Sequence, residues 1–166
     1  MRECTNSDLI VGFTNSGSAL VDWLAQFSGE PTVDEADVVA ARELRAALVT
    51  MLRAHSGSVT NGTEVAAAEA YLRRIAARHP LVAQITAEGC ALVPAQAGVL
   101  GAFGALLAAV TELAYQGRWP RVKVCQNVAC HEAFFDKTRN SSGLYCSAAC
   151  SSQMAMRAYR SRQRAG

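Results

Sequence analysis

The sequence predicts a mainly α-helical protein with a small β-hairpin (an α+β fold), in which a helical N-terminal domain precedes a small cysteine-bearing module. Three observations lead to this prediction. Apolar residues recur at helical spacing through most of residues 18–116. Two short apolar runs flank Ala87-Glu88-Gly89, as the strands of a hairpin do. Four cysteines form two close pairs between Cys125 and Cys150.

Composition and charge divide the chain into two parts. The 166 residues are 51% apolar, which allows a buried core and argues against overall disorder. Residues 1–117 carry 7 Lys and Arg against 12 Asp and Glu, whereas residues 118–166 carry 9 against 2. The net charges are therefore −5 and +7, which sum to +2 for the whole chain. We predict an acidic helical domain over 1–117 and a basic module over 118–166.

Three helices are predicted in the first 80 residues. Leu9–Phe13 is a short apolar segment that fits a strand or the lead-in to a helix, and a helix follows over about 18–27. The second helix runs to about His55, with Thr32 and Glu35 as its capping box. The third covers about 63–78. His55 and His79 stand at helix ends, where we expect them to act as C-terminal caps.

A hairpin and a nearly apolar helix complete the first part. The predicted strands are Leu81–Thr86 and Cys90–Val93, with Gly89 at a positive-φ turn position and Cys90 as a free thiol in the core. Ala95–Gln116 is expected to be a buried helix because it is apolar on all sides. Its longest apolar run is too short to cross a membrane. The helix has a glycine at every third position, at Gly98, Gly101 and Gly104. This spacing indicates close packing against another helix, either within the chain or across a dimer.

The two cysteine pairs have the number and spacing of ligands that a structural zinc ion requires. Four residues separate Cys125 from Cys130, three separate Cys146 from Cys150, and fifteen lie between the pairs. Each pair can hold one ion from a turn while the intervening chain folds back. The alternatives are buried thiols or two disulfides. The N-terminal residues lack the layout of a secretory signal, which speaks against disulfides.

The elements expected around the cysteines follow the order of a treble-clef zinc finger. A strand over about 121–124 leads into Cys125, a return strand follows within 131–136, and a helix carries Cys146 and Cys150 on its first turn. Four thiolates leave zinc no open position, so the metal is expected to stabilise the fold rather than to catalyse. His131, beside Cys130, is an alternative ligand.

Basic side chains accompany this module. Beyond Cys150 the chain has four arginines and no acidic residue, and the turn-rich loop before Cys146 adds two more basic residues. Guanidinium groups contact phosphates and release counterions on binding. We therefore expect six residues to bind nucleic acid: Lys137, Arg139, Arg157, Arg160, Arg162 and Arg164. A merely solvated C-terminus, or docking of the basic tail on the acidic domain, is the alternative.

These residues resemble the CGNR zinc-finger family, bacterial proteins with an N-terminal ABATE domain. The likeness lies in Cys125-x4-Cys130, Phe135-Asp136-x-Thr138-Arg139-Asn140, Tyr145-Cys146-Ser147-x-x-Cys150 and Arg157-x-Tyr159-Arg160-x-Arg162. The first part is similar to the ABATE domain through Phe13-x-Asn15 and the Trp23-Leu24 helix. The resemblance implies a stress-linked transcription regulator whose zinc finger binds DNA. The family has Gly-Asn-Arg after its last cysteine, whereas this chain has Ser151-Ser152-Gln153, so one expected arginine is missing.

The sequence therefore favours a cytoplasmic, zinc-containing DNA-binding protein that regulates transcription. Its helical domain is expected to form a homodimer or to bind a small-molecule effector, and no membrane is expected as partner. The alternatives are a zinc-stabilised module that docks on an acidic protein, or a small-molecule sensor. An enzyme is disfavoured because no catalytic motif is present. Asp8, Asn15 and Asp22 are expected to be caps and surface groups.

Overall fold

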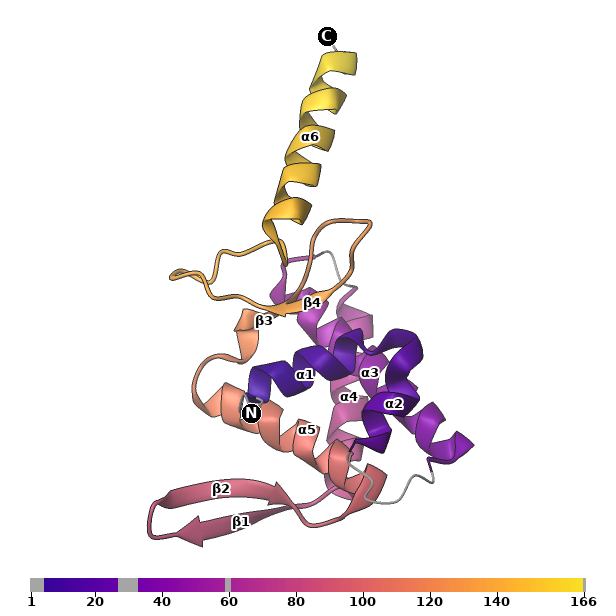
Figure 1. The fold of residues 1–166 in the computed structure, drawn as a ribbon, viewed down its shortest axis with the longest axis vertical. Coiled ribbons are helices and arrows are strands. Elements are labelled where there is room, and N and C mark those ends of the chain that lie inside the picture. Colours follow the sequence, from indigo (N-terminus) through magenta and orange to yellow (C-terminus); the bar gives the residue numbers. More distant parts are fainter. Residues whose placement is uncertain (1–4, 27–32, 59–60, 166) are drawn as a thin grey trace.

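Helices α1 to α5 form the body of the protein in the computed structural model, which describes residues 5–26, 33–58 and 61–165. They are α1 (Asn6–Asn15), α2 (Leu20–Ala25), α3 (Glu35–His55), α4 (Gly62–Arg78) and α5 (Gly98–Tyr115), with a 3-10 turn at Gly17–Ala19. A hairpin of β1 (Leu81–Thr86) and β2 (Gly89–Pro94) lies at one end of this body. At the other end lie β3 (Val122–Val124) and β4 (Ala133–Phe135), and α6 (Ala148–Ala165) projects from there (Figure 1).

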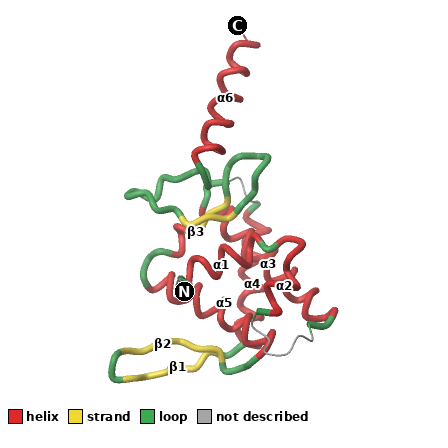
Figure 2. The backbone as a smooth tube through the Cα atoms, in the orientation of Figure 1, coloured by secondary structure: helices red, strands yellow, loops and turns green. Residues whose placement is uncertain are grey.

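The predicted fold class is confirmed: the chain is mainly helical, with two small antiparallel strand pairs and a cysteine-bearing module at its C-terminal end. Loops make up most of the part of that module that lies between β3 and α6, residues 125–147 (Figure 2). A 3-10 turn at Trp119–Arg121 joins α5 to β3. Apart from α6, the module therefore has little regular structure, which is the situation in which a metal ion commonly supplies the missing stability.

Side-chain caps set the beginnings of three helices. At α1, the Thr5 side chain accepts a hydrogen bond from the Asp8 amide, and the Asp8 carboxylate accepts one from the Thr5 amide. Leu9–Phe13 consequently lies inside α1, and the strand alternative is wrong. At α3, Asp34 and Asp37 form the capping box in place of the predicted pair, whose Thr32 lies outside the described residues. Asn61 caps α4.

The β1–β2 hairpin differs from its prediction in two respects. Thr86 pairs with Gly89 across a two-residue turn, so Gly89 belongs to β2, and its φ is not positive. Cys90 pairs with Ile85 near the tip, where both side chains are exposed, and its predicted place in the core is wrong. The apolar run had suggested burial, but the strands extend beyond the helices that could cover them (Figure 1).

Helix α5 is the central core helix of the body. It packs against α1 and β2 and buries Val99, Phe103, Leu106 and Leu113. By length and composition alone it is the one helix, within the described ranges, that could cross a membrane, a test that core helices also pass. Gly101 and Gly104 face the chain segment 94–96, where an added Cβ would lie 2.6 Å from the Gln96 carbonyl oxygen and 2.9 Å from the Pro94 Cβ, respectively.

The core extends without a break from the body into the cysteine module. Val122, Val124 and Ala133 are at most 5% exposed and belong to the same buried cluster as Phe13 of α1 and Leu48 of α3. Strand β3 packs against α3, and β4 packs against α1. The two parts of the chain are therefore held against each other through apolar surfaces, although their net charges are opposite.

Candidate metal centre

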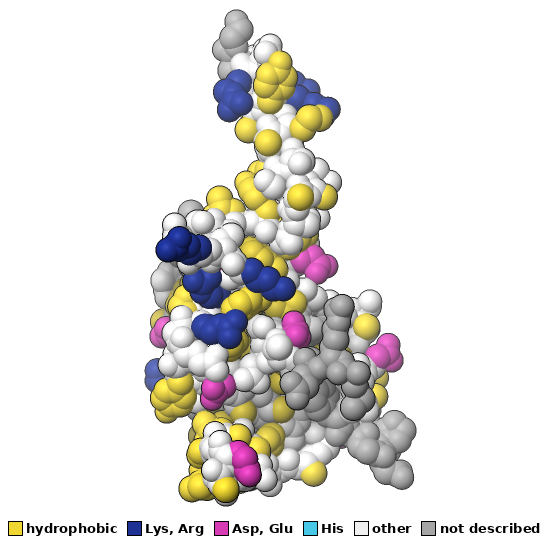
Figure 3. Space-filling model, turned by 60° about the vertical axis from the view of Figure 1, so that its left-hand side comes forward, with side chains coloured by type: hydrophobic (Ala, Val, Ile, Leu, Met, Phe, Trp, Pro, Cys, Tyr) yellow, Lys and Arg dark blue, Asp and Glu magenta, His cyan; other side chains and the backbone are white. Residues whose placement is uncertain are grey.

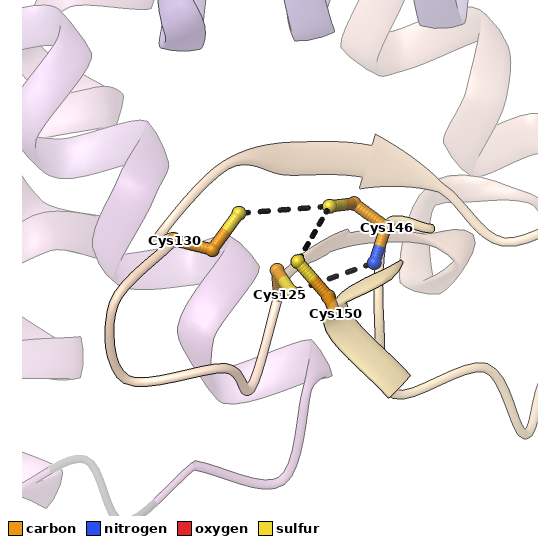
Figure 4. Close-up of side chains that lie close together, drawn as sticks. All are labelled: Cys125, Cys130, Cys146 and Cys150. Atoms are coloured by element: carbon orange, nitrogen blue, oxygen red, sulfur yellow. Dashed lines mark hydrogen bonds between the residues drawn. The ribbon is translucent and has the colours of Figure 1, made fainter. Parts of the chain in front are cut away.

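The four cysteines of the two pairs come together in one cluster, as Figure 4 shows. Their sulfur atoms all lie within 4.8 Å of one another; Sγ of Cys146 is 3.6 Å from that of Cys130 and 3.7 Å from that of Cys150. A zinc ion with four Zn–S bonds of about 2.3 Å places its sulfurs about 3.8 Å apart. Disulfide sulfurs are only about 2 Å apart, so the geometry fits four free thiols around a tetrahedral metal ion.

A tight turn after β3 presents the first pair. The Cys125 amide donates to the Glu132 carbonyl (2.8 Å), and the Cys130 amide donates to the Asn127 carbonyl (2.8 Å). The buried Asn127 side chain accepts from the Ala129 amide and donates to Oε1 of Gln153 on α6 (2.9 Å). The turn thus fixes both sulfurs and is itself fixed to the helix that carries Cys150.

The second pair stands at the beginning of α6. Cys146 lies two residues before the helix rather than on its first turn, and its amide donates to Sγ of Cys125 (3.5 Å). Ser147 directly precedes the helix, and its hydroxyl accepts from the Cys150 amide (3.3 Å), as an N-cap does. The partial positive charge of this helix end favours thiolates at both positions.

Proton affinities in the cluster show how the sulfurs influence one another. Burial and the three neighbouring thiols raise the pKa of Cys146 to about 12. Hydrogen bonding with the side chains of Asn127 and Ser147 lowers the pKa of Cys150 to about 7. Four clustered thiols therefore resist full deprotonation unless a cation balances their charge, and a metal ion that binds here must displace protons.

Ser56 and His55, at the C-terminal end of α3, hold the outer edge of β3. The Ser56 hydroxyl donates to the Val124 carbonyl (3.0 Å) and accepts from the Val124 amide (2.8 Å). His55 contacts the Val122 carbonyl through Nδ1 (3.0 Å), and its ring lies edge-on to Trp119. His55 therefore binds the module and does not cap its own helix. Burial lowers its pKa below the ordinary 6.5, and the nearby Lys123 charge adds to this effect.

Asn15, at the end of α1, holds the edge of β4 in the same way. Its Nδ2 donates to the Ala133 carbonyl (3.0 Å), and its Oδ1 accepts from the Ala133 amide (2.7 Å). Its expected role as a cap or surface group is wrong. Body side chains thus pair with both outer edges of this two-stranded sheet, which positions the cysteine turn between α1 and α3.

A buried ion pair builds the loop that precedes Cys146. Nζ of Lys123 lies 2.7 Å from the Asp136 carboxylate, and both side chains are nearly inaccessible. Asp136 also accepts hydrogen bonds from Thr138 and from the Gly143 amide. Arg121 donates to the carbonyls of Asp136, Thr138 and Arg139. The roles of Lys123 and Arg121 could not be predicted from the sequence, because alternation in a short strand gives no sign of a buried charge.

The six basic residues predicted to bind nucleic acid are all exposed. Lys137 and Arg139 lie on the loop built by Asp136, and the four arginines lie on α6. The helical period places Arg157, Arg160 and Arg164 on one face of α6 and Arg162 on the other side. Dark blue side chains gather over the module and near the end of α6 in Figure 3, whereas magenta ones lie mostly over the body.

The basic tail does not dock on the acidic body in the part of the chain that the structure describes. The one salt bridge there, Lys123–Asp136, lies within the module, and α6 makes no substantial packing contact with another element. His131 has a positive φ and stands outside the sulfur cluster. Gln153, where the CGNR pattern has arginine, is engaged with Asn127.

Fold and site together define a class: a helical protein that carries a four-cysteine structural zinc module and a projecting basic helix. Residues 121–163 match the CGNR zinc finger, and residues 14–116 match the ABATE family, described as "Putative stress-induced transcription regulator". Since the second match covers well over half of the chain, the protein belongs to the ABATE family, and its cofactor is zinc. No curated protein matches the chain.

Proposed function

We propose that Cys125, Cys130, Cys146 and Cys150 together bind one zinc ion, and that the finger so formed binds DNA as part of a cytoplasmic transcription regulator. The sulfur spacing supports the ligand set, because it agrees with a tetrahedral four-thiolate site. A closed site of this kind supplies folding energy and has no position for a substrate. The zinc ion therefore acts by fixing the loop and α6, which carry the basic residues.

The observation that carries the DNA-binding proposal is the free basic face of α6. Three arginines share that face without an ion-pair partner among the described residues, and the helix projects away from the acidic body (Figure 1). Its 18 residues span about 27 Å, which is enough to follow a DNA groove or backbone. Lys137 and Arg139 extend the positive surface to the foot of the helix.

Zinc binding is tested by Cys146→Ser, with Cys90→Ser as the matched control. Cys90 is an exposed free thiol far along the chain from the cluster. Mass spectrometry under native conditions should find one zinc ion in the unaltered protein and in Cys90→Ser, and none in Cys146→Ser. Retention of zinc by Cys146→Ser would contradict the four-cysteine ligand set.

DNA binding is tested by fluorescence anisotropy with duplexes of random sequence over a salt series. Replacing Arg157, Arg160 and Arg164 by glutamine should weaken binding and reduce the slope of log K against log salt by about 2 to 3 units. The control variant carries glutamine at Arg42, Arg73 and Arg74, three exposed arginines of the body. Equal losses in both variants, or salt-insensitive binding of the unaltered protein, would count against the proposal.

A further inference from the structure

A cavity of about 390 Å³ lies in the helical body, between α3, α4 and the first half of α5, away from the zinc module. Its volume falls within the range of small-molecule sites, which are mostly apolar with a few convergent polar groups. Six apolar residues line it: Ala36, Ala40, Leu44, Ile75, Leu100 and Phe103. The polar lining residues are Asp37, Arg78, His79 and Gln96.

His79 is the buried polar group of this cavity. Its side chain is only 7% exposed, its Nδ1 lies 2.9 Å from Oε1 of Gln96, and its ring stands edge-on to Phe103. The second ring nitrogen, Nε2, has no hydrogen-bond partner among the described residues, and it is not enclosed, since no buried side-chain nitrogen there lacks a partner. Nε2 is therefore open to the cavity that His79 lines, where a ligand atom can form a hydrogen bond with it.

The position of His79 is set by the glycines of α5. Gly101 and Gly104 leave room for the chain segment 94–96 to lie against the helix, since a Cβ at either position would collide with that segment. This close approach carries the Gln96 side chain to His79. The spacing of these glycines predicted helix or dimer packing, whereas within the described chain they bring a hydrogen-bond partner to a buried histidine.

The charges around the cavity favour an acidic ligand group. Arg78 lines the cavity and forms no ion pair with any carboxylate in the described part of the chain. Asp37 carries the opposite charge, but its carboxylate already accepts a hydrogen bond from the Asp34 amide (3.3 Å) as part of the α3 capping box. Ala36 and Asp37 belong to the first turn of α3, an end of the helix that attracts negative charge.

We propose that this cavity binds a small monocarboxylic acid with an apolar body. Arg78 contacts one carboxylate oxygen. Because Nδ1 of His79 donates its proton to Oε1 of Gln96, one proton taken up from solvent on binding is held between the other carboxylate oxygen and Nε2. The apolar body of the acid lies against Leu44, Ile75 and Phe103. The proposal locates a ligand site in the helical domain and does not depend on whether the finger binds DNA.

The test uses the full-length, zinc-loaded protein with 3-phenylpropanoate and its uncharged analogue, 3-phenylpropanamide, in NMR titrations. The acid should bind saturably and at least about tenfold more tightly than the amide, as expected for a charge-assisted contact. Arg78→Gln should abolish this preference, and Leu100→Trp, which fills the cavity from its rim, should abolish binding of both compounds.

Arg73→Gln is the matched control, because Arg73 is exposed on the same helix and does not line the cavity. It should leave the affinity for the acid unchanged. Circular dichroism and thermal melting establish that each variant is folded. Absence of saturable binding of the acid, equal affinity for acid and amide, or an unchanged preference in Arg78→Gln would each overturn the proposal.

Discussion

Asp136 organises the loop that connects the small sheet to the second cysteine pair. Burial alone would raise its pKa, but the Lys123 ammonium and hydrogen bonds from Thr138 and Gly143 hold that pKa well below its usual range. The carboxylate therefore stays ionised at neutral pH, and both of its oxygens accept hydrogen bonds. This explains physically why Asp136 and Thr138 occur in the segment that resembles the CGNR pattern: they form the framework on which Lys137 and Arg139 are exposed.

Gly143 is required by the same framework. A Cβ at this position would lie 2.6 Å from Oδ1 of Asp136. The Asp136 carboxylate could move away from it only by disturbing its ion pair with Lys123. We expect Gly143→Ala to reduce the free energy of unfolding by about 1–3 kcal/mol through overpacking, measured by urea denaturation. Gly62→Ala is the control, since its Cβ would meet nothing within 4 Å. Equal stability of the two variants would show that the loop can relax.

His55 makes the contact between the body and the finger sensitive to pH. Its pKa in the folded protein is lowered, chiefly by burial, so the unfolded chain binds more protons as the pH falls below the ordinary value of 6.5. The folded state is then progressively destabilised in that acidic window, whereas above it the histidine adds no such penalty. Thermal melting between about pH 7.5 and 5.5 should show this decrease in Tm.

His55→Gln should flatten the pH dependence while lowering Tm at neutral pH, because the contact with Val122 is weakened. Zinc content is measured in parallel, since acid also protonates cysteine ligands. An equal fall in Tm for both proteins, with zinc still bound, would assign the effect to other groups.

At the scale of elements, helix ends position the finger. Asn15, the last residue of α1, pairs with the backbone of β4, and Ser56, directly after α3, pairs with the backbone of β3, as neighbouring strands would. A two-stranded sheet has little stability by itself, so these contacts are expected to contribute strongly to its position on the body.

Asn15→Ala tests this contribution. It leaves the Ala133 amide and carbonyl without their partner, and Ala133 is only 5% exposed. We expect a loss of about 1–3 kcal/mol in the free energy of unfolding and faster hydrogen exchange at the Ala133 amide. Asn140→Ala, in the exposed loop, is the control and should change neither quantity. Unchanged protection at Ala133 in Asn15→Ala would contradict the docking role.

Elements defined by local signals could be predicted, and contacts between distant residues could not. Periodicity and caps located α3, α4 and α5 to within a few residues, and the cysteine spacing identified the metal cluster. Asn15 contacts Ala133 across 118 residues, and Ser56 contacts Val124 across 68, distances at which a single sequence carries no pairing signal. Cys90 was misplaced because an apolar run predicts a strand without showing whether another element covers it.

At the scale of the whole molecule, the body and the finger depend on each other. The family matches divide the chain near residues 116–121, yet the buried cluster crosses that boundary through Val122, Val124 and Ala133. The finger holds these apolar residues in place, and the body pairs with the strands that carry them. Zinc bound at one end of the molecule is therefore expected to stabilise helices that it does not touch.

Removal of zinc with a chelator tests this dependence. Without the metal the finger loses its cysteine turn and its hold on β3 and β4, so the apolar ends of α1 and α3 become exposed. We expect the Tm of the body helices, followed by circular dichroism, to fall by roughly 5–10 °C, which corresponds to about 2–3 kcal/mol for a chain of this size. Zinc added in stoichiometric amount should restore the Tm, because a ligand stabilises the state that binds it.

Cys90→Ser should respond in the same way as the unaltered protein, whereas Cys146→Ser should melt at the lower temperature with or without zinc. A body that melts at one temperature in all three proteins, with and without zinc, would show that the finger is an independent appendage and that the shared core contributes nothing to the stability of the helices.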